Sequence, residues 1–352
     1  MLESEVEVFL SRSGNASLTV NLYKPTDVDS FWSFLRRMKE HTQRWRVFDF
    51  DFDDDTYKGG PSFYNRLSTE LEKLELPRLT HLRLMYKQDK VASTQIRTPY
   101  FFADWTMPHL DTLALSGITS AFPVSMFPED LTTLELMLNK EDGVKPKRYV
   151  SEVTRVLSAI PRLRNLHMVV GWGFATDHQP KNIKKVELNA LRTMSIECAN
   201  YSSEISNEAL RHLLCNLHTP NLIDYSCSVR APSCKKIESQ QLSYLLLNDA
   251  TTIQNLTLDV EGKLEDACPF EEFLSALSNL EFLAIRSACL PPSFDITKAR
   301  MPPLRTITFS KCTFEYPQFL KSLKSAIKSG QYRPRFERFY YEDCEFPYIL
   351  HM

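Results

Sequence analysis

A short apolar pattern recurs through this chain: an apolar residue, two variable residues, an apolar residue, one variable residue and a third apolar residue. PRLTHLRL at 77–84 returns as PHLDTLAL at 108–115, EDLTTLEL at 129–136 and PRLRNLHM at 161–168. The first apolar residues of the copies are Trp45, Leu79, Leu110, Leu131, Leu163, Leu191, Leu222, Ile253, Leu280, Leu304 and Phe336. Their mean spacing is about 29 residues. A repeat of this length predicts an array of stacked units whose core grows unit by unit.

Each copy reads as a short strand. Side chains alternate between the two faces of a strand, so the second and third apolar residues of a copy, such as Leu82 and Leu84, point the same way. One short strand cannot bury that face alone, but parallel stacking of successive copies does. Between the copies, apolar residues at helical spacing predict helices. The clearest sets are Val150, Val153, Leu157 and Ile160; Leu210, Leu213, Leu214 and Leu217; Phe270, Phe273, Leu274 and Leu277; and Phe319, Leu320, Leu323 and Ile327.

The copies match the leucine-rich-repeat signature. We therefore predict an α/β fold, a leucine-rich-repeat solenoid with parallel strands on the concave face and helices on the convex face. The repeats are irregular, at about 29 residues each, and about eleven of them fill residues 45–352. Residues 1–44 are expected to form an N-terminal capping segment, a strand through Leu18, Val20 and Leu22 followed by an amphipathic helix with Phe31, Phe34, Leu35 and Met38 on one face.

Proline placement supports this reading. Six of the 20 prolines stand two residues before the first apolar residue of a copy, where proline ends the preceding helix and precedes the strand ladder. These are Pro77, Pro108, Pro161, Pro220, Pro302 and Pro334.

Charge and cysteine content exclude several classes. The 42 Lys and Arg nearly balance the 44 Asp and Glu, which argues against a nucleic-acid-binding protein. No apolar run is long enough to span a membrane, and the N-terminus does not resemble a secretory signal. The eight cysteines form no C-x-x-C pair, so a reducing compartment, cytoplasmic or nuclear, is expected. Asn139, Cys198, Cys289, Cys312 and Cys344 lie just after strand motifs, where small buried groups would bond the loop backbone.

The N-terminal region resembles a known family. The stretch SRSGNASL at 11–18, a helix ending in HTQRW, and the run of P-x-L-x-x-L-x-L motifs look like the repeat region of the F-box proteins of mushroom-forming (basidiomycete) fungi. That resemblance implies the target-binding half of a ubiquitin-ligase substrate receptor. An F-box would dock on a Skp-type adaptor, but too few residues precede Phe9 to form the box itself. We therefore expect an F-box-like chain without its F-box, with the adaptor a partner only if a box lies upstream.

No motif predicts catalysis, a cofactor or a metal ion. The run DFDFDDD at 49–55 spaces its acids like a calcium loop, but Asp54 replaces the required glycine, so a strand edge and solvated turn are the favoured interpretation. Gly171 and Gly173 lack the third glycine of a dinucleotide fingerprint. The histidines occur in no catalytic motif, and we predict a chain that is not an enzyme.

The remaining functional surface is the strand face that points away from the core. Its side chains are mixed in charge and include Arg and aromatic types, which suits protein recognition. The predicted protein-binding residues are Arg83, Glu135, His167, Glu197, Asp224, Asp259, Phe282, Arg286, Arg338 and Tyr340. The connections 86–107 and 171–182 are alternative contact sites, although their aromatic residues are expected to pack over the repeats. The sequence thus predicts a non-enzymatic binding module for an unknown target protein, either a ligase receptor or a stand-alone interaction scaffold.

Overall fold

The structure is a computed structural model of the 352-residue chain. It describes residues 3–23, 27–53, 66–87, 102, 104–116, 127–138, 147–170, 185–198, 204–230, 236–237, 250–264, 274–290, 304–314, 325 and 337–345. The chain forms two compact units, residues 1–163 and residues 164–352, which are described separately.

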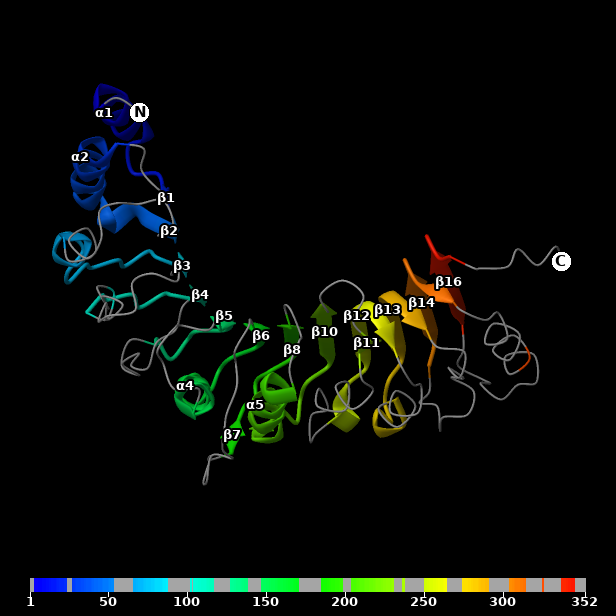
Figure 1. Ribbon diagram of the computed structural model, residues 1–352. Helices are drawn as coiled ribbons and strands as arrows, with labels where there is room; N and C mark the ends of the chain where they lie inside the picture. Colours follow the sequence, from blue (N-terminus) through cyan, green and yellow to red (C-terminus); the bar gives the residue numbers. More distant parts are fainter. Residues whose placement is uncertain are drawn as a thin grey trace. The chain divides into compact units, whose positions relative to one another are not determined.

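The first unit is a parallel sheet with the strand order β1-β2-β3-β4-β5, so that neighbouring strands follow one another along the chain (Figure 1). Helices α1 and α2 lie beside its first strands. The elements are α1 (Glu3–Ser13), β1 (Leu18–Tyr23), α2 (Val28–Lys39), the 3-10 turn η1 (Thr42–Arg44), β2 (Trp45–Asp53), β3 (His81–Lys87), β4 (Thr112–Ser116), β5 (Thr133–Leu138) and α4 (Lys147–Ser158).

The second unit repeats this arrangement in the order β6-β8-β10-β12-β13-β14-β16, again with parallel pairs. Short strands β11 and β15 pair with β12 and β13, and β7 pairs with β9 in a separate two-stranded sheet. The elements are β6 (Asn165–Val170), β7 (Val186–Glu187), β8 (Thr193–Cys198), α5 (Glu204–Cys215), β9 (Leu217–His218), β10 (Asp224–Arg230), β11 (Lys236–Ile237), η4 (Ala250–Thr252), β12 (Asn255–Leu264), β13 (Phe282–Leu290), β14 (Thr306–Ser310), β15 (Thr313–Phe314) and β16 (Arg338–Glu342).

The three apolar positions of the repeat form the core. In the copies from Trp45 to Leu304, the first apolar side chain is at most 1% exposed. The second and third apolar side chains of these copies are at most 6% exposed, the value for Leu84. Helices α4 and α5 add the predicted residues Val150, Val153, Leu157, Leu210 and Leu213 to this core. Repeated parallel strands with one buried face and helices in the connections confirm the predicted α/β leucine-rich-repeat solenoid.

A turn precedes the strand in the copies from Leu79 to Leu280, and this turn explains where the prolines stand. The backbone N–H of the first apolar residue donates to the carbonyl three residues earlier, for example from Leu79 to Leu76 at 3.1 Å. Proline therefore occupies the second position of a turn, where its fixed φ is favoured. The residue at the start of the turn is also buried in seven of these copies: Leu76, Met107, Ile160, Leu188, Thr219, Ala250 and Leu277. In the copy that begins at Leu131, Pro128 takes this place and is half-buried. Pro302 and Pro334 lie outside the described residues.

The N-terminal strand joins the sheet directly. Leu18, Val20 and Leu22 are buried as predicted, and β1 pairs in parallel with β2. In α2 the buried face includes Trp32 at 3% exposure, and Phe34 is only half-buried. Trp32 packs edge-on against Phe31 and beneath the guanidinium of Arg66, 4.5 Å from its ring centre. A boundary between a capping segment and the array at residue 45 stays a prediction.

A buried arginine ties α1 to the start of the array. Arg44, at 8% exposure, donates from Nε to the carbonyl of Ala16 at 3.0 Å and from Nη2 to Ser13 Oγ at 2.5 Å. Ser13 in turn donates to the carbonyl of Leu10, near the end of α1. Gly14 follows with a φ of +51°, which glycine adopts without strain. The SRSGNASL stretch and Arg44 therefore hold the turn between α1 and β1 in place.

Candidate functional site: the open face of the sheet

We call the strand face opposite the buried leucines the open face. All ten predicted binding residues lie on its strands. Those on β3 to β13 alternate with buried residues, whereas on β16 Phe339 is half-buried and Tyr341 is exposed. In the first unit, the register aligns Asp49, Arg83, Ala114 and Glu135 in one row. In the second unit, three rows run across the strands. One contains Asp224, Phe282 and Arg338; one begins at His167 and ends at Tyr340; and one contains Glu197, Asp259 and Arg286.

Several of these charges are satisfied within the chain. Arg83 pairs with Asp49 at 3.3 Å, so the predicted binding residue is engaged by the neighbouring strand, and Ala114 separates it from Glu135. Glu197 pairs with Arg230 at 3.4 Å. Asp224 accepts a hydrogen bond from Asn255 Nδ2 at 2.5 Å. Exposed ion pairs contribute little stability, but a charge that already has a partner in the chain attracts a binding partner less strongly.

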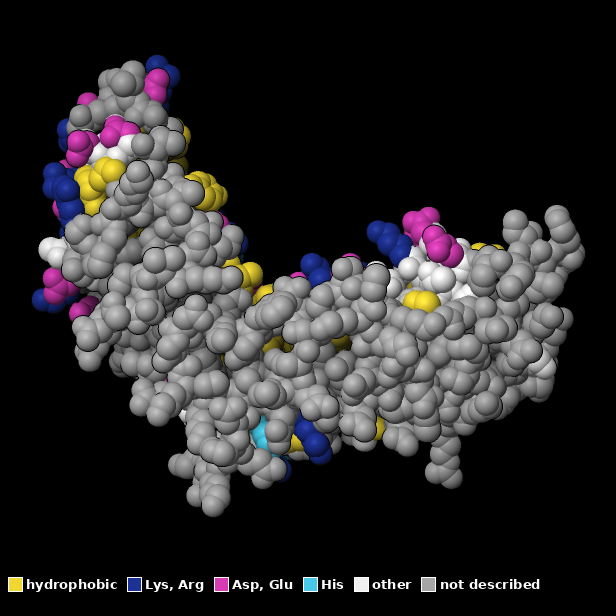
Figure 2. Space-filling view, viewed as in Figure 1, with side chains coloured by type: hydrophobic (Ala, Val, Ile, Leu, Met, Phe, Trp, Pro, Cys, Tyr) yellow, Lys and Arg dark blue, Asp and Glu magenta, His cyan; other side chains and the backbone are white. Residues whose placement is uncertain are grey.

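The open face carries different side chains on β13, β14 and β16, the described strands nearest the C-terminal end of the sheet. Phe282 and Arg286 come from β13, and Arg338 and Tyr340 come from β16, so the four large side chains flank β14. The intervening β14 positions are short: Thr306, Thr308 and Ser310. Phe282 is 43% exposed and Tyr340 is 48% exposed. We call Phe282, Arg286, Arg338 and Tyr340 the anchor patch. Figure 2 shows charged side chains of both signs, with apolar side chains near them, where Figure 1 places β13 to β16.

The two arginines of the anchor patch have no close carboxylate among the described residues. Within the described residues, neither Arg286 nor Arg338 has a carboxylate within 4.0 Å. Asp259 lies opposite Arg286 in the register of β12 and β13, without forming that close pair. The patch thus combines two exposed aromatic rings with two guanidinium groups. The sequence identified all four residues by type, and the register of the sheet brings them together.

The described residues offer no metal centre. No group of three or more His, Cys, Asp and Glu side chains among them is arranged to hold a metal ion. The start of the DFDFDDD run lies in β2, with Phe48 and Phe50 buried, as a strand with one buried face requires. The turn from Asp54 onward and the Gly171–Gly173 segment lie outside the described residues. Among the described helices, none is long and apolar enough to cross a membrane.

The connection 86–107 contributes to the core where it is described. Trp105 is 6% exposed, donates from Nε1 to the carbonyl of Leu71 at 2.6 Å and packs edge-on against Phe48. Phe102 is buried beside it. These two aromatic residues therefore pack over the repeats, as expected, and the connection 171–182 lies outside the described residues.

The cysteines near strand ends are structural. Cys312 and Cys344 occupy equivalent places in successive copies, and their thiols lie 3.4 Å from the carbonyl oxygen of Ile285 and 3.6 Å from that of Phe309. The residue before each, Lys311 and Asp343, has a positive φ, and Ser287 shares this conformation one copy earlier. The predicted role, a small buried group bonded to the backbone, is confirmed for Cys312, whereas Cys344 makes the equivalent bond from a half-buried position. In the earlier copy Ala288 occupies the equivalent position, so Cys289 lies one residue beyond it.

Buried thiols are expected to resist alkylation. Burial raises the pKa of Cys227 to about 12 and that of Cys312 to about 11, and it raises the pKa of Cys198 well above its usual value. Because only the thiolate reacts, iodoacetamide at about pH 8 should label these three at least about tenfold more slowly in the native protein than in urea. Mass spectrometry of tryptic peptides measures the rates, with half-buried Cys344 as the internal reference. Equal labelling of Cys227 and Cys344 would contradict the buried placement.

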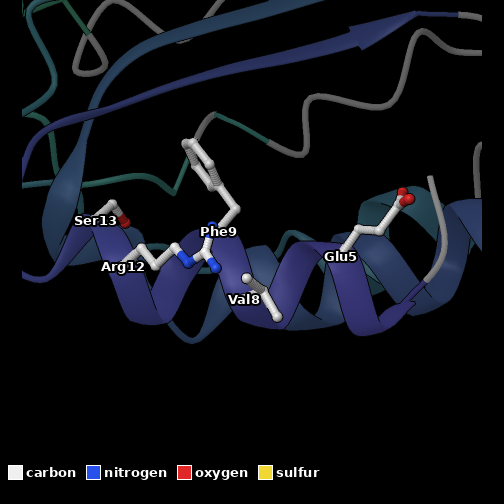
Figure 3. A pocket seen from close by; sticks show the side chains of 5 residues that line it. All are labelled: Glu5, Val8, Phe9, Arg12 and Ser13. Atoms are coloured by element: carbon white, nitrogen blue, oxygen red, sulfur yellow. The ribbon is translucent and has the colours of Figure 1, made fainter.

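The sequence did not identify a second exposed surface, on α1. Val8 and Phe9 are 48% and 59% exposed, and with Glu5, Arg12 and Ser13 they line a groove along the helix (Figure 3). The signal was present, because Glu5, Val8, Phe9 and Arg12 recur at the three-to-four spacing of one helix face.

Comparisons with known proteins give only distant likenesses. No family model and no curated protein matches the sequence. Among solved structures, the chain is similar to TLR13 in its complex with ssRNA13, at 14% identity over 87% of this chain and 47% of that one, with a TM-score of 0.35. An internalin (inlF) of Listeria monocytogenes is similar at 14% identity over 80% and 85%, with a TM-score of 0.29. The leucine-rich repeat domain of APL1 follows at 12% identity over 92% of both chains, with a TM-score of 0.24. The chain spans about half the length of the TLR13 chain.

Proposed function

We propose that this chain is a non-enzymatic protein-binding module that recognises its partner through the open face, with the anchor patch as the main contact. The observation that carries the proposal is the grouping of Phe282, Arg286, Arg338 and Tyr340 around the short side chains of β14. Aromatic and arginine side chains dominate the energetics of protein interfaces. The sheet also holds their backbone in place, so the freedom lost on binding is that of the side chains.

The partner's chemistry follows from the patch. The charges at Arg83 and Glu197 already have counterions in the chain, whereas the two arginines of the patch have none within 4.0 Å among the described residues. Arginine donates two parallel hydrogen bonds to a carboxylate, and the two rings offer apolar area beside them. The matching surface is therefore a segment that carries Asp or Glu side chains next to an apolar or aromatic side chain.

Neighbouring tyrosines of β16 provide the test. Tyr340 lies on the open face, and Tyr341, at 64% exposure, lies on the opposite face of the same strand. We expect Tyr340→Ala to reduce recovery of specific partners by about tenfold or more, the typical effect of losing an aromatic contact at an interface centre. Affinity purification from the source cells with quantitative mass spectrometry compares this variant with wild type.

The control is Tyr341→Ala, which removes the same side chain from the other face and should leave partner recovery unchanged. Arg338→Glu should act like Tyr340→Ala because it reverses the charge of the patch. Equal recovery by the Tyr340→Ala, Tyr341→Ala and Arg338→Glu variants would rule out the anchor patch as the contact.

The resemblance to F-box proteins supports a narrower role, as the target-binding half of a ubiquitin-ligase receptor. Of its most specific residues, Arg44 donates to Ser13 and Ala16 in the SRSGNASL stretch, and Trp45 donates from Nε1 to the carbonyl of Met38 in α2. The Skp-type adaptor would require an F-box upstream. The alternative is a stand-alone scaffold inside the cell, without linkage to a ligase.

Partner identity separates these two roles. Co-precipitation of the product of the complete gene with a Skp-type adaptor, together with ubiquitin-remnant peptides on the bound targets, supports the receptor role. Stable partners that carry no such peptides, in a precipitate that lacks the adaptor, support the scaffold and contradict the receptor.

A further inference from the structure

Two cysteines lie opposite each other just beyond the ends of β14 and β16. An isolated parallel bridge pairs Thr313 with Glu345, the residues that follow Cys312 and Cys344. The backbone N–H of Glu345 donates to the carbonyl of Cys312 at 2.9 Å. Neighbouring strands are spaced about 4.8 Å apart, which falls within the roughly 4.4–6.8 Å between the Cα atoms of disulfide-bonded cysteines. The backbone of this pair is therefore spaced for a disulfide.

The two thiols also lie on the same side of their strands. Each lies near a carbonyl oxygen of the preceding copy: Cys312 Sγ is 3.4 Å from that of Ile285, and Cys344 Sγ is 3.6 Å from that of Phe309. Because Phe309 belongs to β14, the Cys344 thiol already reaches toward the strand that leads into Cys312. The two sulfur atoms meet when Cys312 gives up its bond to Ile285 and turns toward β16.

Another pair of cysteines on neighbouring strands is placed differently. The register of β8 and β10 aligns Cys198 with Val229 and Cys227 with Ile196, so the two cysteines are offset by two residues. The strand spacing and the rise per residue separate their Cα atoms by roughly 8 Å, beyond the ~7 Å that a disulfide spans. Both side chains are also 1% exposed. This pair is therefore a reference that should not crosslink.

We propose that Cys312 and Cys344 form a reversible disulfide when the chain meets hydrogen peroxide. Half-buried Cys344 reacts first: its sulfur attacks the peroxide, the O–O bond breaks, and a sulfenic acid and one water molecule form. The buried Cys312 thiol then attacks the sulfenic sulfur, so that the S–S bond forms and the S–O bond breaks. The leaving hydroxide takes the proton of Cys312 as a second water molecule. A thiol reductant reverses the reaction by exchange.

The disulfide fastens a strand that has little other support. Among the described strands, β16 has a hydrogen-bonded neighbour on one side only, β14. A covalent link between residues that are 32 positions apart in the chain limits how far this strand can separate. Because β16 carries Arg338 and Tyr340, the link also holds two residues of the anchor patch beside β14. The formation of the disulfide itself does not rest on the proposed function.

Mass spectrometry after peroxide treatment is the first test. The full chain is oxidised, its remaining thiols are blocked with N-ethylmaleimide, and it is digested with trypsin without reductant. We expect the peptide 312–321 to be joined to the peptide that begins at Phe339, and dithiothreitol should separate the two. Cys198 and Cys227 should give no linked peptides in the same digest. Circular dichroism checks that the oxidised chain keeps its fold.

Single variants separate the roles of the two thiols. Cys344→Ser removes the sulfur that meets peroxide, so Cys312 should oxidise at least about tenfold more slowly than in wild type. Cys312→Ser removes the thiol that resolves the sulfenic acid, so dimedone should trap at least about tenfold more of that acid on Cys344. The matched control is Cys289→Ser, because Cys289 lies beside Thr313 in the register rather than beside Cys312. This control should crosslink like wild type.

Hydrogen exchange measures the effect on β16. The amides of this strand should exchange at least about tenfold more slowly in the oxidised chain than in the reduced chain, whereas those of β8 and β10 should not change. A wild-type chain that forms no link between Cys312 and Cys344 under peroxide would overturn the proposal. Dimedone labelling of Cys344 that is equal in wild type and Cys312→Ser would overturn the resolving role. Unchanged exchange of β16 in a fully crosslinked chain would refute the fastening of the strand.

Discussion

Replacing Leu256 by alanine is expected to lower the free energy of unfolding by about 2–5 kcal/mol, the range for truncating a fully buried leucine. Leu256 is 1% exposed on β12, and in the register it lies between Tyr225 of β10 and Leu283 of β13, which are both buried. The cavity left by the substitution thus adjoins two neighbouring strands. Urea denaturation followed by circular dichroism measures the loss as a shift of the midpoint.

The next residue provides the control. Thr257 is half-buried on the open face, and Thr257→Ala should change the free energy of unfolding by no more than about 0.5 kcal/mol. A register that differs by one residue would exchange the two faces of the strand and reverse this order. A larger loss for Thr257→Ala than for Leu256→Ala would therefore refute the assignment of the core face.

The core was predictable because its requirement repeats. Each repeat strand from β2 to β14 buries one apolar face, so the same three positions carry apolar residues in these copies despite changes in spacing. The buried position that starts each turn was not recognised in the sequence. Its occupants include Leu76, Met107, Thr219 and Ala250, a set that shares burial but not chemical type. A position that tolerates a small hydroxyl and a long thioether leaves no simple pattern.

The candidate sites were predictable only in part. Side-chain type and alternation placed Phe282 and Tyr340 on the open face, but their proximity depends on which strands are neighbours. The pairing of Arg83 with Asp49 likewise joins residues of two copies, so the sequence alone did not show that the charge of Arg83 has a counterion. The exposed face of α1 was missed because an apolar residue near a chain end reads as core until burial is known.

Removal of the Arg44 side chain is expected to cost about 2–3 kcal/mol, because Arg44→Ala deprives two acceptors of a charged donor in a site that is largely closed to water. Arg44 reaches the Ala16 carbonyl and the Ser13 hydroxyl at once. Lysine has one compact ammonium group in place of a planar fork, so Arg44→Lys should recover only part of the loss. Arg46→Ala, an exposed arginine two residues along the chain, is the control and should stay within about 0.5 kcal/mol of wild type.

A double-mutant cycle with Ser13→Ala separates the arginine's bonds from its packing. The Ser13 hydroxyl receives a hydrogen bond from Arg44 and donates one to the carbonyl of Leu10, so it transmits the arginine's position to the end of α1. Two residues joined in this way should show a coupling of at least about 0.5 kcal/mol, so the double variant loses less than the sum of the single losses. Additive losses would mean that Arg44 acts through packing alone. A measured coupling would instead show that Arg44 and Ser13 act together to fix α1, the helix that presents Val8 and Phe9, on the first strands of the array.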